Sequence, residues 1–462
     1  MKSGFSKIDI TSPLGTVMGG HPGTKKAGRI INRLYVSSMA ISDEKATLIF
    51  SSADLLFVGN ESVDRIKKAV SQTTGIRENN LFISATHTHS GPLTTGLFGR
   101  TEEGEYVKEI EKSIAESMIL AVNNLEEAEL FTGRSMANNL SFCARYIMKG
   151  GRVETHPFKY DEDMLYPEDI VDEELIVLFS KNKDGKIKSI LVNYANHPQV
   201  MKRENDGISA DFPAAMAKYI KIHLGDDVNV LFINGACGDI CPVDARNTNI
   251  AEIGESYCDL LGRRLSLKVF AAIENAVPVI GDIYLKSANV ELTLRDISKE
   301  KLNTAKEFLR LNTNKVFTEP QVSNYGTELP DKQAVSLEEY LKLDCWKAQE
   351  YTDILNLYEK IKQSPDEKVN ISALSIGELS IVTVPFEMFT RIGLTIKEKS
   401  PFKRTAVFEL TNGNAGYLPA KKAFERQGGY ETLTLCSSRF EEAADEKVLY
   451  AITKLLEELK GE

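Results

Sequence analysis

Residues 81–92 of the chain read Leu81-Phe82-Ile83-Ser84-Ala85-Thr86-His87-Thr88-His89-Ser90-Gly91-Pro92. An apolar run ends here abruptly in a polar turn that contains glycine and proline, which is typical of a buried strand and the loop after it. The same pattern recurs at residues 46–50, 190–195, 228–233, 379–384 and 405–410. Short buried strands of this kind are the units of the predicted fold.

Helical periodicity separates several of these strands. Apolar residues recur at helical spacing within residues 107–118 and 216–223, and residues 257–276 and 442–459 have the pattern of amphipathic helices. Strands that alternate with helices predict an α/β fold with mixed β-sheets flanked by helices. The chain shows no regular eightfold repeat of strand and helix, which a TIM-barrel amidohydrolase would require.

The segment 297–366 differs in composition from its surroundings. It is rich in lysine, glutamate and leucine, and it contains Trp346, the only tryptophan of the chain. We predict two or three exposed helices that form a helical insertion, because apolar strands resume after this segment. Since the polar strand ends on both sides of the insertion are expected to build one site, we interpret residues 1–462 as a single domain.

Composition narrows the classes of function. The 462 residues are 42% hydrophobic and 26% charged, with a formal net charge of −10 at pH 7, whereas a nucleic-acid-binding surface needs basic residues. No run approaches the roughly 18 apolar residues of a membrane span, and the N-terminus lacks an apolar signal segment. The six cysteines form no CxxC pair, as expected for reduced thiols. We therefore expect a cytoplasmic protein with a small-molecule substrate, no nucleic-acid partner and no stable membrane insertion, and a homo-oligomer is left open.

Three of the six histidines follow predicted strands. His87 and His89 are two residues apart, so their side chains share one face of an extended chain. A neutral imidazole is a good zinc ligand, and catalytic zinc keeps a position open for water. The pair therefore predicts a metal or catalytic site. A single histidine after a strand is more often a hydrogen-bonded structural residue, so His197 alone is a weaker signal, and Glu387 alone is weaker still.

A second polar turn reads Asn234-Gly235-Ala236-Cys237-Gly238-Asp239-Ile240-Cys241-Pro242. Its two glycines would let the backbone approach a ligand closely or adopt a positive φ, and a cysteine and an aspartate lie beside them. A phosphate-binding loop is excluded, because no Gly-Lys-Ser/Thr follows. The other interpretation is a tight strand–helix turn with a buried thiol.

Together these segments resemble the neutral (non-lysosomal) ceramidase family, and in particular short bacterial ceramidase-like hydrolases of unknown substrate. The His-Thr-His-Ser-Gly-Pro block is highly specific, and weaker motifs follow in the right order. The other motifs are residues 9–15, Asn196-His197-Pro198, residues 209–213, residues 234–242, Val384-Pro385-Phe386-Glu387, Gly416-Tyr417 and Tyr430-Glu431. The resemblance covers most of the chain and implies a neutral-ceramidase-type catalytic domain with the helical insertion at 297–366.

The resemblance also implies one zinc ion (Zn2+) per chain. Carried across the matching motifs, the ligands are two histidines, a glutamate and a tyrosine, namely His87, His197, Glu387 and Tyr417. Tyr430 is the alternative if the tyrosine register is wrong. The same resemblance implies that His89 hydrogen-bonds the reacting group, that Arg145 helps to bind substrate near the metal, and that Asp239 matches the aspartate of a Gly-Asp-x-Ser-Pro motif. Either His89 or Asp239 is then expected to protonate the leaving group.

Two further residues keep alternative interpretations. Cys241 replaces the serine of that motif, and it is either a nucleophile with a lowered pKa or a passive pocket residue. His21, in Gly19-Gly20-His21-Pro22-Gly23, either lines the pocket or lies in a surface loop.

The expected activity is a zinc-dependent hydrolase that cleaves a carboxamide (N-acyl) bond through a zinc-activated water. The replacement of serine by Cys241 argues against ceramide itself as the substrate. A cytoplasmic enzyme without a membrane-docking segment is expected to act on a small soluble amide or ester. A zinc-dependent esterase or lactonase is an alternative, because a zinc-bound hydroxide attacks amides and esters alike. A non-catalytic metal-binding relative is the other alternative.

Overall fold

A computed structural model describes the chain except for residues 21–24, 97–103, 202–204, 248–251, 318–334 and 336. Three mixed β-sheets form its centre, with the strand orders β5-β4-β3-β1-β6, β15-β13-β12-β7-β17 and β18-β19-β20-β22. The first sheet consists of β1 (Lys2–Asp9), β3 (Tyr35–Ser42), β4 (Thr47–Ala53), β5 (Leu81–Ala85) and β6 (Glu126–Glu127). The second consists of β7 (Glu129–Met136), β12 (Glu174–Lys181), β13 (Ile187–Tyr194), β15 (Asn229–Asn234) and β17 (Val277–Pro278). The third consists of β18 (Ile283–Thr293), β19 (Asp366–Ile376), β20 (Leu379–Thr383) and β22 (Arg404–Phe408).

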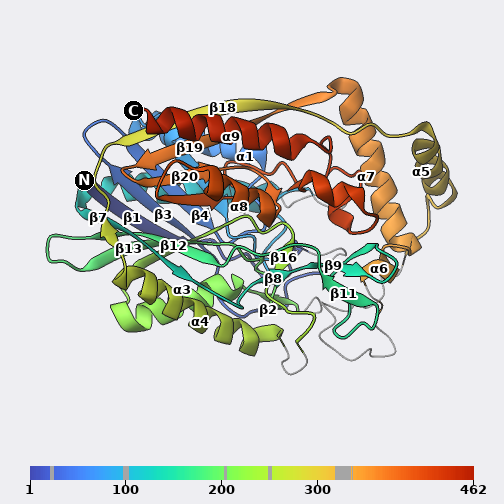
Figure 1. Ribbon diagram of the computed structural model, residues 1–462, viewed down its shortest axis with the longest axis horizontal. Coiled ribbons are helices and arrows are strands. Elements are labelled where there is room, and N and C mark those ends of the chain that lie inside the picture. Colours follow the sequence, from blue (N-terminus) through green and yellow to red (C-terminus); the bar gives the residue numbers. More distant parts are fainter. Residues whose placement is uncertain (21–24, 97–103, 202–204, 248–251, 318–334, 336) are drawn as a thin grey trace.

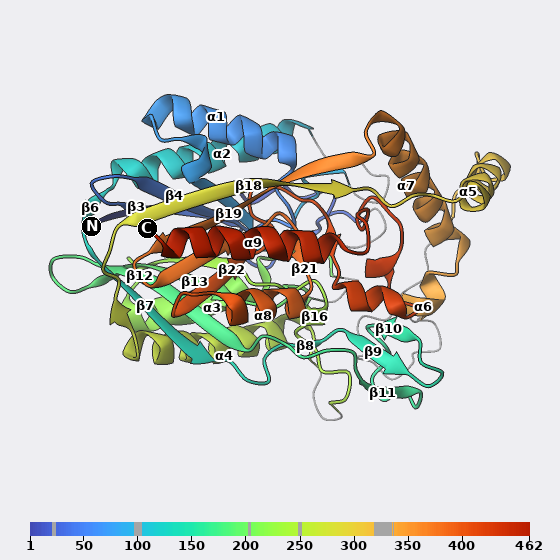
Figure 2. The same ribbon diagram turned by 45° about the horizontal axis from the view of Figure 1, so that its top comes forward.

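A pair of helices covers one face of each sheet. The pairs are α1 (Asn60–Thr74) and α2 (Gly104–Asn123) on the first sheet, α3 (Asp211–Leu224) and α4 (Gly254–Glu274) on the second, and α8 (Thr390–Lys399) and α9 (Ala444–Lys460) on the third. Figure 2 shows these three pairs one above another, with the strands between them. The helices expected at 257–276 and 442–459 are α4 and α9. The mixed α/β fold is therefore confirmed.

The inner faces of the three sheets share one apolar cluster. Alternate residues of a strand belong to different clusters: Phe50 of β4 faces the shared cluster, whereas Ile49 faces α1 and α2. In the same way Leu178 of β12 points inward, and Val177 packs toward α3 and α4. Strands that are buried on both faces read as continuous apolar runs. This double burial explains why the strand signals in the sequence are uninterrupted rather than alternating.

Three helices occupy the described part of the segment 297–366. They are α5 (Lys299–Leu311), α6 (Leu337–Tyr340) and α7 (Asp344–Gln363), and they lie at the end of the molecule away from both termini (Figure 1). Trp346 is buried in the same apolar cluster as residues of the third sheet and of α9, so the helices share a core with that sheet. The interpretation of residues 1–462 as a single domain stays a prediction.

Short ladders complete the fold around the strand ends. They are formed by β2 (Arg29–Ile30) with β14 (Gly207–Ile208), β8 (Phe142–Cys143) with β16 (Ile240–Cys241), β21 (Glu387–Met388) with β23 (Tyr417–Leu418), and β9 (Arg145–Met148) with β10 (Val153–Thr155) and β11 (Met164–Pro167). Single turns of 3₁₀ helix occur at Glu78–Asn80, Lys421–Glu425 and Tyr430–Thr432. No helix in the described part of the chain is both long enough and apolar enough to cross a membrane.

Candidate active site

Each of the three sheets contains one pair of parallel neighbours, namely β4 with β5, β13 with β15, and β20 with β22. Because the carboxyl ends of parallel strands meet at the same edge of a sheet, the loops that follow these strands gather at one place. Hydrogen bonds join the three edges: Asn234 Nδ2 donates to the carbonyl of Thr86 (3.2 Å), and the Glu409 N–H donates to the carbonyl of Asn234 (3.1 Å). The loops carry His87 and His89 after β5, His197 after β13, and Glu387 after β20.

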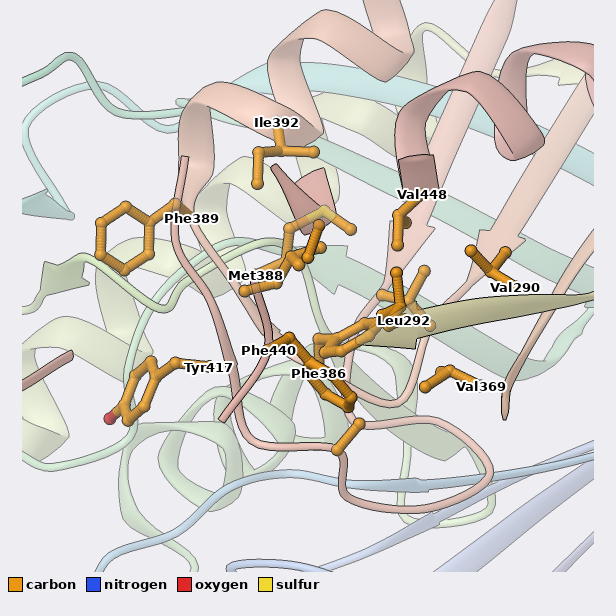
Figure 3. Close-up of a cluster of buried hydrophobic side chains, with 14 of the residues drawn as sticks. Val290, Leu292, Val369, Phe386, Met388, Phe389, Ile392, Tyr417, Phe440 and Val448 are labelled. Atoms are coloured by element: carbon orange, nitrogen blue, oxygen red, sulfur yellow. The ribbon is translucent and has the colours of Figure 1, made fainter. Parts of the chain in front are cut away.

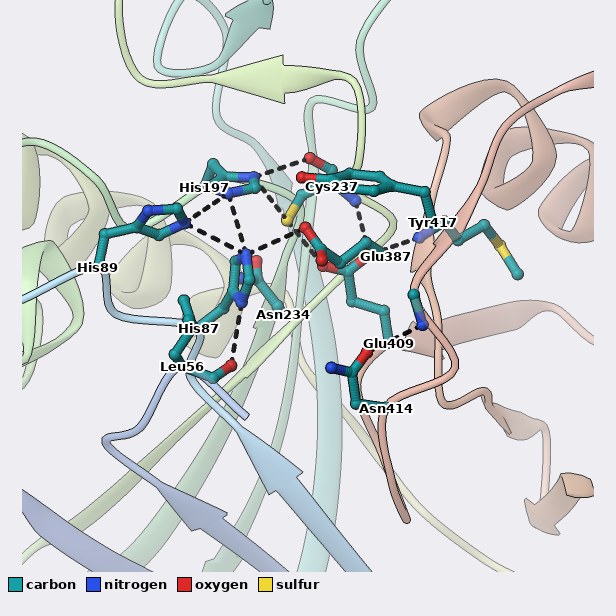
Figure 4. A network of polar contacts seen from close by, with 12 residues as sticks. Leu56, His87, His89, His197, Asn234, Cys237, Glu387, Glu409, Asn414 and Tyr417 are labelled. Atoms are coloured by element: carbon teal, nitrogen blue, oxygen red, sulfur yellow. Dashed lines mark hydrogen bonds and ion pairs between the residues drawn. The ribbon is translucent and has the colours of Figure 1, made fainter. Parts of the chain in front are cut away.

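Three imidazole rings converge at this place (Figure 4). His87 Nε2 lies 3.0 Å from His197 Nε2 and 3.4 Å from His89 Nε2, and the Nε2 atoms of His89 and His197 are 2.9 Å apart. Glu387 Oε2 lies 3.3 Å from His87 Nε2. A tetrahedral zinc ion with bonds of about 2.0–2.1 Å separates neighbouring ligand atoms by about 3.4 Å. These side chains therefore have the spacing that a single metal ion requires.

Backbone carbonyls fix the orientation of two of the rings. His87 Nδ1 lies 3.0 Å from the carbonyl of Leu56, and His197 Nδ1 lies 3.2 Å from the carbonyl of Cys237. A carbonyl can only accept, so Nδ1 carries the proton and Nε2 presents its lone pair to the centre of the cluster. Metal-binding histidines are commonly held in this way. Lone pairs that face one another repel unless a cation lies between them, and the donor set therefore fits a metal ion.

The electrostatics of the cluster also favour a cation. Burial lowers the pKa of His87, but the adjacent Glu387 carboxylate outweighs it and raises the pKa. Burial, followed by repulsion from His87, lowers the pKa of His197 to about 3. For Glu387, burial raises the pKa, but attraction to His87 prevails and the pKa is lowered. The site thus keeps a buried carboxylate charged and favours one positive charge among the rings, which a metal ion would supply.

Glu387 and Tyr417 come from distant parts of the sequence and are paired directly in the parallel ladder of β21 with β23. The hydroxyl groups of Tyr417 and Tyr430 are 3.4 Å apart, so both tyrosines considered as ligands lie at the same site. Burial raises the pKa of both phenols, and both stay protonated at neutral pH. Figure 3 shows the Tyr417 ring at the border of an apolar cluster, with its hydroxyl directed away from that cluster.

The two glycines of the turn 234–242 serve close packing between chain segments. A Cβ atom on Gly235 would lie 3.0 Å from the Ala195 backbone, and one on Gly238 would lie 2.6 Å from the carbonyl oxygen of Glu387. The Gly238 N–H also donates to the carbonyl of Met388 (2.8 Å). The turn therefore presses against the backbone that carries Glu387.

Replacing Gly238 by alanine is expected to lower both the stability of the protein and its metal content. The added methyl group must displace the Glu387 backbone, and overpacking of this kind costs about 1–3 kcal/mol. Thermal unfolding and elemental analysis of the purified variant check the prediction. Gly104→Ala is the matched control, because no atom of the described residues lies within 4 Å of a Cβ at that position. Equal metal content in wild type and Gly238→Ala would show that the close contact does not set the position of Glu387.

Asp239 and Cys241 have partners outside the histidine cluster. Asp239 Oδ1 accepts from the N–H (2.7 Å) and the hydroxyl (2.8 Å) of Thr390 at the start of α8, and burial raises its pKa to about 7. Cys241 is 2% exposed and donates from Sγ to the carbonyl of Val243 (3.1 Å), and burial raises the pKa of its thiol. Within the described residues, no hydrogen bond joins either side chain to the three histidines. The contacts of Asp239 hold the start of α8, and its part in proton transfer stays a prediction. Cys241 fits the passive interpretation, since a nucleophile needs a lowered pKa.

Arg145 is fully buried between two carboxylates. Its Nε donates to Glu168 (2.5 Å) and its Nη1 to Glu431 (2.6 Å), and the hydroxyl of Thr155 also donates to Glu431 (2.9 Å). Its Nη2 atom is buried and has no hydrogen-bond partner among the described residues. Since Glu431 follows Tyr430 in the chain, this network borders the site. A role of Arg145 in substrate binding stays a prediction.

Two buried residues beside the cluster had no assigned role from the sequence. Cys237 Sγ lies 3.7 Å from His197 Nδ1 and donates to Glu409 Oε1 (2.7 Å). Glu409 is 0% exposed, and burial raises its pKa to about 8. The only signal for Glu409 was a carboxylate inside the otherwise apolar run 405–410. His21, considered for the pocket, lies outside the described residues.

Three sheets whose strand ends carry converging histidines and a carboxylate define an α/β protein with a candidate metal site. The family model for neutral/alkaline non-lysosomal ceramidase, N-terminal, matches residues 2–246, which is more than half of the chain. The chain belongs to this ceramidase family, as the resemblance predicted.

Two solved ceramidase structures share the fold. The crystal structure of neutral ceramidase from Pseudomonas aeruginosa is 17% identical in sequence, with a TM-score of 0.72 over 98% of this chain and 74% of that chain. A ceramidase complexed with C2 is 16% identical, with a TM-score of 0.70 over 100% of this chain and 75% of that chain. At these identities the likeness concerns the fold.

Proposed function

We propose that this protein is a zinc-dependent hydrolase that cleaves the carboxamide (N-acyl) bond of a small, soluble substrate. One observation carries the proposal: three imidazole Nε2 atoms lie 2.9–3.4 Å apart, and the Glu387 carboxylate lies 3.3 Å from one of them. Membership of a ceramidase family supports hydrolysis of an amide bond. The formal net charge of −10 supports a small molecule rather than a nucleic acid as the partner.

In this proposal one zinc ion is held by His87, His197, Glu387 and Tyr417. Bound zinc supplies a Lewis acid for the scissile carbonyl and lowers the pKa of a bound water. His87 and His197 are 1% and 3% exposed, as expected for metal ligands that lie on the buried side of the ion. The carbonyls of Leu56 and Cys237 keep both rings in the ligand tautomer.

His89 is assigned to the reacting group because of its exposure. It is only half-buried, whereas the other two rings of the cluster are buried, so it borders the space from which a substrate enters. An imidazole at this position can hydrogen-bond the developing oxyanion and pass a proton to the leaving nitrogen. The protonated phenol of Tyr430 is a second donor beside the metal ligands.

Arg145 supports recognition of an uncharged group. The two carboxylates of Glu168 and Glu431 offset its positive charge, and its Nη2 keeps N–H donors without a partner in the described part of the chain. A donor without excess charge suits a carbonyl or hydroxyl oxygen of the substrate better than a carboxylate or phosphate. We therefore expect neutral N-acyl compounds to be better substrates than acidic ones.

Zinc-loaded wild-type protein is expected to hydrolyse short, neutral N-acyl amides, and His89→Gln is expected to lower kcat by about 10²–10⁴-fold while zinc is retained. The reason is that glutamine keeps a polar side chain of similar size but cannot transfer a proton. Release of the amine from a panel of N-acyl amides, esters and lactones measures the activity, and elemental analysis measures the zinc.

Three outcomes would contradict these assignments. Loss of zinc from His89→Gln would make His89 a metal ligand, as its distances to the other two rings also allow. Turnover of esters or lactones without turnover of amides would replace the proposed amidase by an esterase or lactonase. Bound zinc with no turnover across the whole panel would favour a non-catalytic metal-binding relative.

A further inference from the structure

Glu409 is a buried carboxylate that lies behind the histidine cluster and has no place in the proposed chemistry. It follows the last residue of β22 and is 0% exposed. Its Oε2 accepts from the N–H of Cys237 (2.9 Å) and from the N–H of Met388 (3.1 Å), and its Oε1 accepts from Sγ of Cys237 (2.7 Å). Burial of a carboxylate is costly unless donors compensate it, and here three donors offset part of that cost.

One donor belongs to the segment that carries Glu387, and the other two belong to the residue that orients the His197 ring. Met388 is the neighbour of Glu387 in β21. The carbonyl of Cys237 lies 3.2 Å from His197 Nδ1, so the residue that Glu409 holds is also the residue that orients the His197 ring. One carboxylate on the third sheet therefore ties together two segments that come from different sheets (Figure 4).

The backbone around Glu409 supports the same role. The Glu409 N–H donates to the carbonyl of Asn234 (3.1 Å), and the next N–H, that of Leu410, donates to the carbonyl of Phe386 (3.2 Å). Leu410 has φ of +46°, a left-handed conformation that is unfavourable for leucine and is kept only where the surroundings require it. Main chain and side chain of this segment thus contact both the second sheet and the loop of Glu387.

We propose that Glu409 is a positioning residue, which sets the distance between His197 and Glu387 and so prepares the site for its metal ion. This inference rests on the proposed function, because it needs a metal ion at the cluster. Glu409 acts through the backbone of Met388 and through Cys237, and it is not itself a ligand. Outer partners of metal ligands typically contribute 10–100-fold to metal affinity.

The test is the zinc dissociation constant, measured by competition with a chromogenic chelator for wild type, Glu409→Gln and Glu409→Ala. Glu409→Ala removes all three acceptor contacts and is expected to weaken zinc binding about 100-fold, whereas Glu409→Gln keeps one acceptor oxygen and is expected to weaken it about 10-fold. The visible absorption of the cobalt-substituted protein is expected to change in both variants, because the ligand geometry relaxes.

Asp43→Asn is the matched control. Asp43 also accepts hydrogen bonds from backbone N–H groups of two segments: its Oδ1 accepts from Ala46 (2.6 Å) and its Oδ2 from Ile283 (2.8 Å). It lies in the loop between β3 and β4, and in the described part of the chain none of its hydrogen bonds reaches the histidines. This variant is expected to lose stability without any change in zinc affinity. A parallel loss of zinc affinity in Asp43→Asn would show that general destabilisation, rather than positioning, weakens the site.

The outcomes separate this inference from the proposed function. Wild-type protein that binds no zinc would overturn the proposed function itself. Wild-type protein that binds zinc, with Glu409→Gln binding it equally well and with an unchanged cobalt spectrum, would overturn only the positioning role. Glu409→Gln keeps the shape of the side chain. The comparison of wild type with Glu409→Gln therefore tests the positioning role even if Glu409→Ala does not fold.

Discussion

Replacing either His87 or Glu387 by alanine is expected to empty the metal site and abolish hydrolysis. The two side chains come from different sheets and are 3.3 Å apart at Nε2 and Oε2. Zinc-finger peptides bind their four-ligand structural zinc with about 10–16 kcal/mol, and on that scale one ligand accounts for roughly 3 kcal/mol, or more than about 100-fold in affinity. Elemental analysis of purified wild type and both variants, followed by the amide assay, measures the effect.

His223→Ala is the control for this comparison. His223 is exposed on α3, and its Nδ1 lies 3.0 Å from the carbonyl of Tyr219, so its loss leaves the cluster untouched. The ligand assignment predicts near-stoichiometric zinc in wild type and in His223→Ala, and little zinc in His87→Ala and Glu387→Ala. This result would show that His87 and Glu387, far apart in sequence, belong to one metal site. Zinc retained in both His87→Ala and Glu387→Ala would refute the ligand assignment.

Arg145→Ala is expected to have the largest effect on stability. The substitution leaves the carboxylates of Glu168 and Glu431 without their common cation, and Glu431 is only 1% exposed. Removing one partner of a buried ion pair typically lowers the free energy of unfolding by about 3–5 kcal/mol. Urea denaturation at pH 7 measures this loss.

The same loss is expected to depend on pH. Burial raises the pKa of Glu431, and Arg145 opposes this shift, so the pKa rises further when Arg145 is absent. A carboxyl group with a raised folded-state pKa destabilises the fold while it is charged, and the penalty fades as pH falls toward its ordinary value of about 4.3. The gap between wild type and Arg145→Ala should therefore narrow as the pH is lowered.

Arg391→Ala serves as the control for Arg145→Ala. Arg391 pairs with Asp169 but is 44% exposed, and exposed pairs contribute only about 0–1 kcal/mol. Equal stability of wild type and Arg145→Ala at pH 7 would mean that the two carboxylates do not depend on this arginine. If the difference in unfolding free energy between wild type and Arg145→Ala narrows at low pH, the loss comes from the missing positive charge. A loss of packing alone would not depend on pH.

The sequence predicted local features well where one short segment carries the whole signal. The run 81–85 followed by His87 and His89 predicted a strand and two residues of the histidine cluster, because strand pattern and metal-ligand chemistry both lie within a few residues. The helix expected at 442–459 corresponds to α9 at Ala444–Lys460. Cys241 was harder to interpret, since its burial, which a sequence does not display, raises the pKa of its thiol and keeps it protonated.

The sequence by itself determined the α/β class, the strand ends that carry the candidate ligands, and the family. The tertiary structure alone decided that parallel strands from three sheets bring those ends together and that Glu387 pairs with Tyr417. It alone showed Glu409 and Cys237 behind the histidines. The physical reason is that periodicity and residue type act over a few neighbours, whereas a site made of distant segments depends on strand order and on the burial of groups that no local pattern encodes.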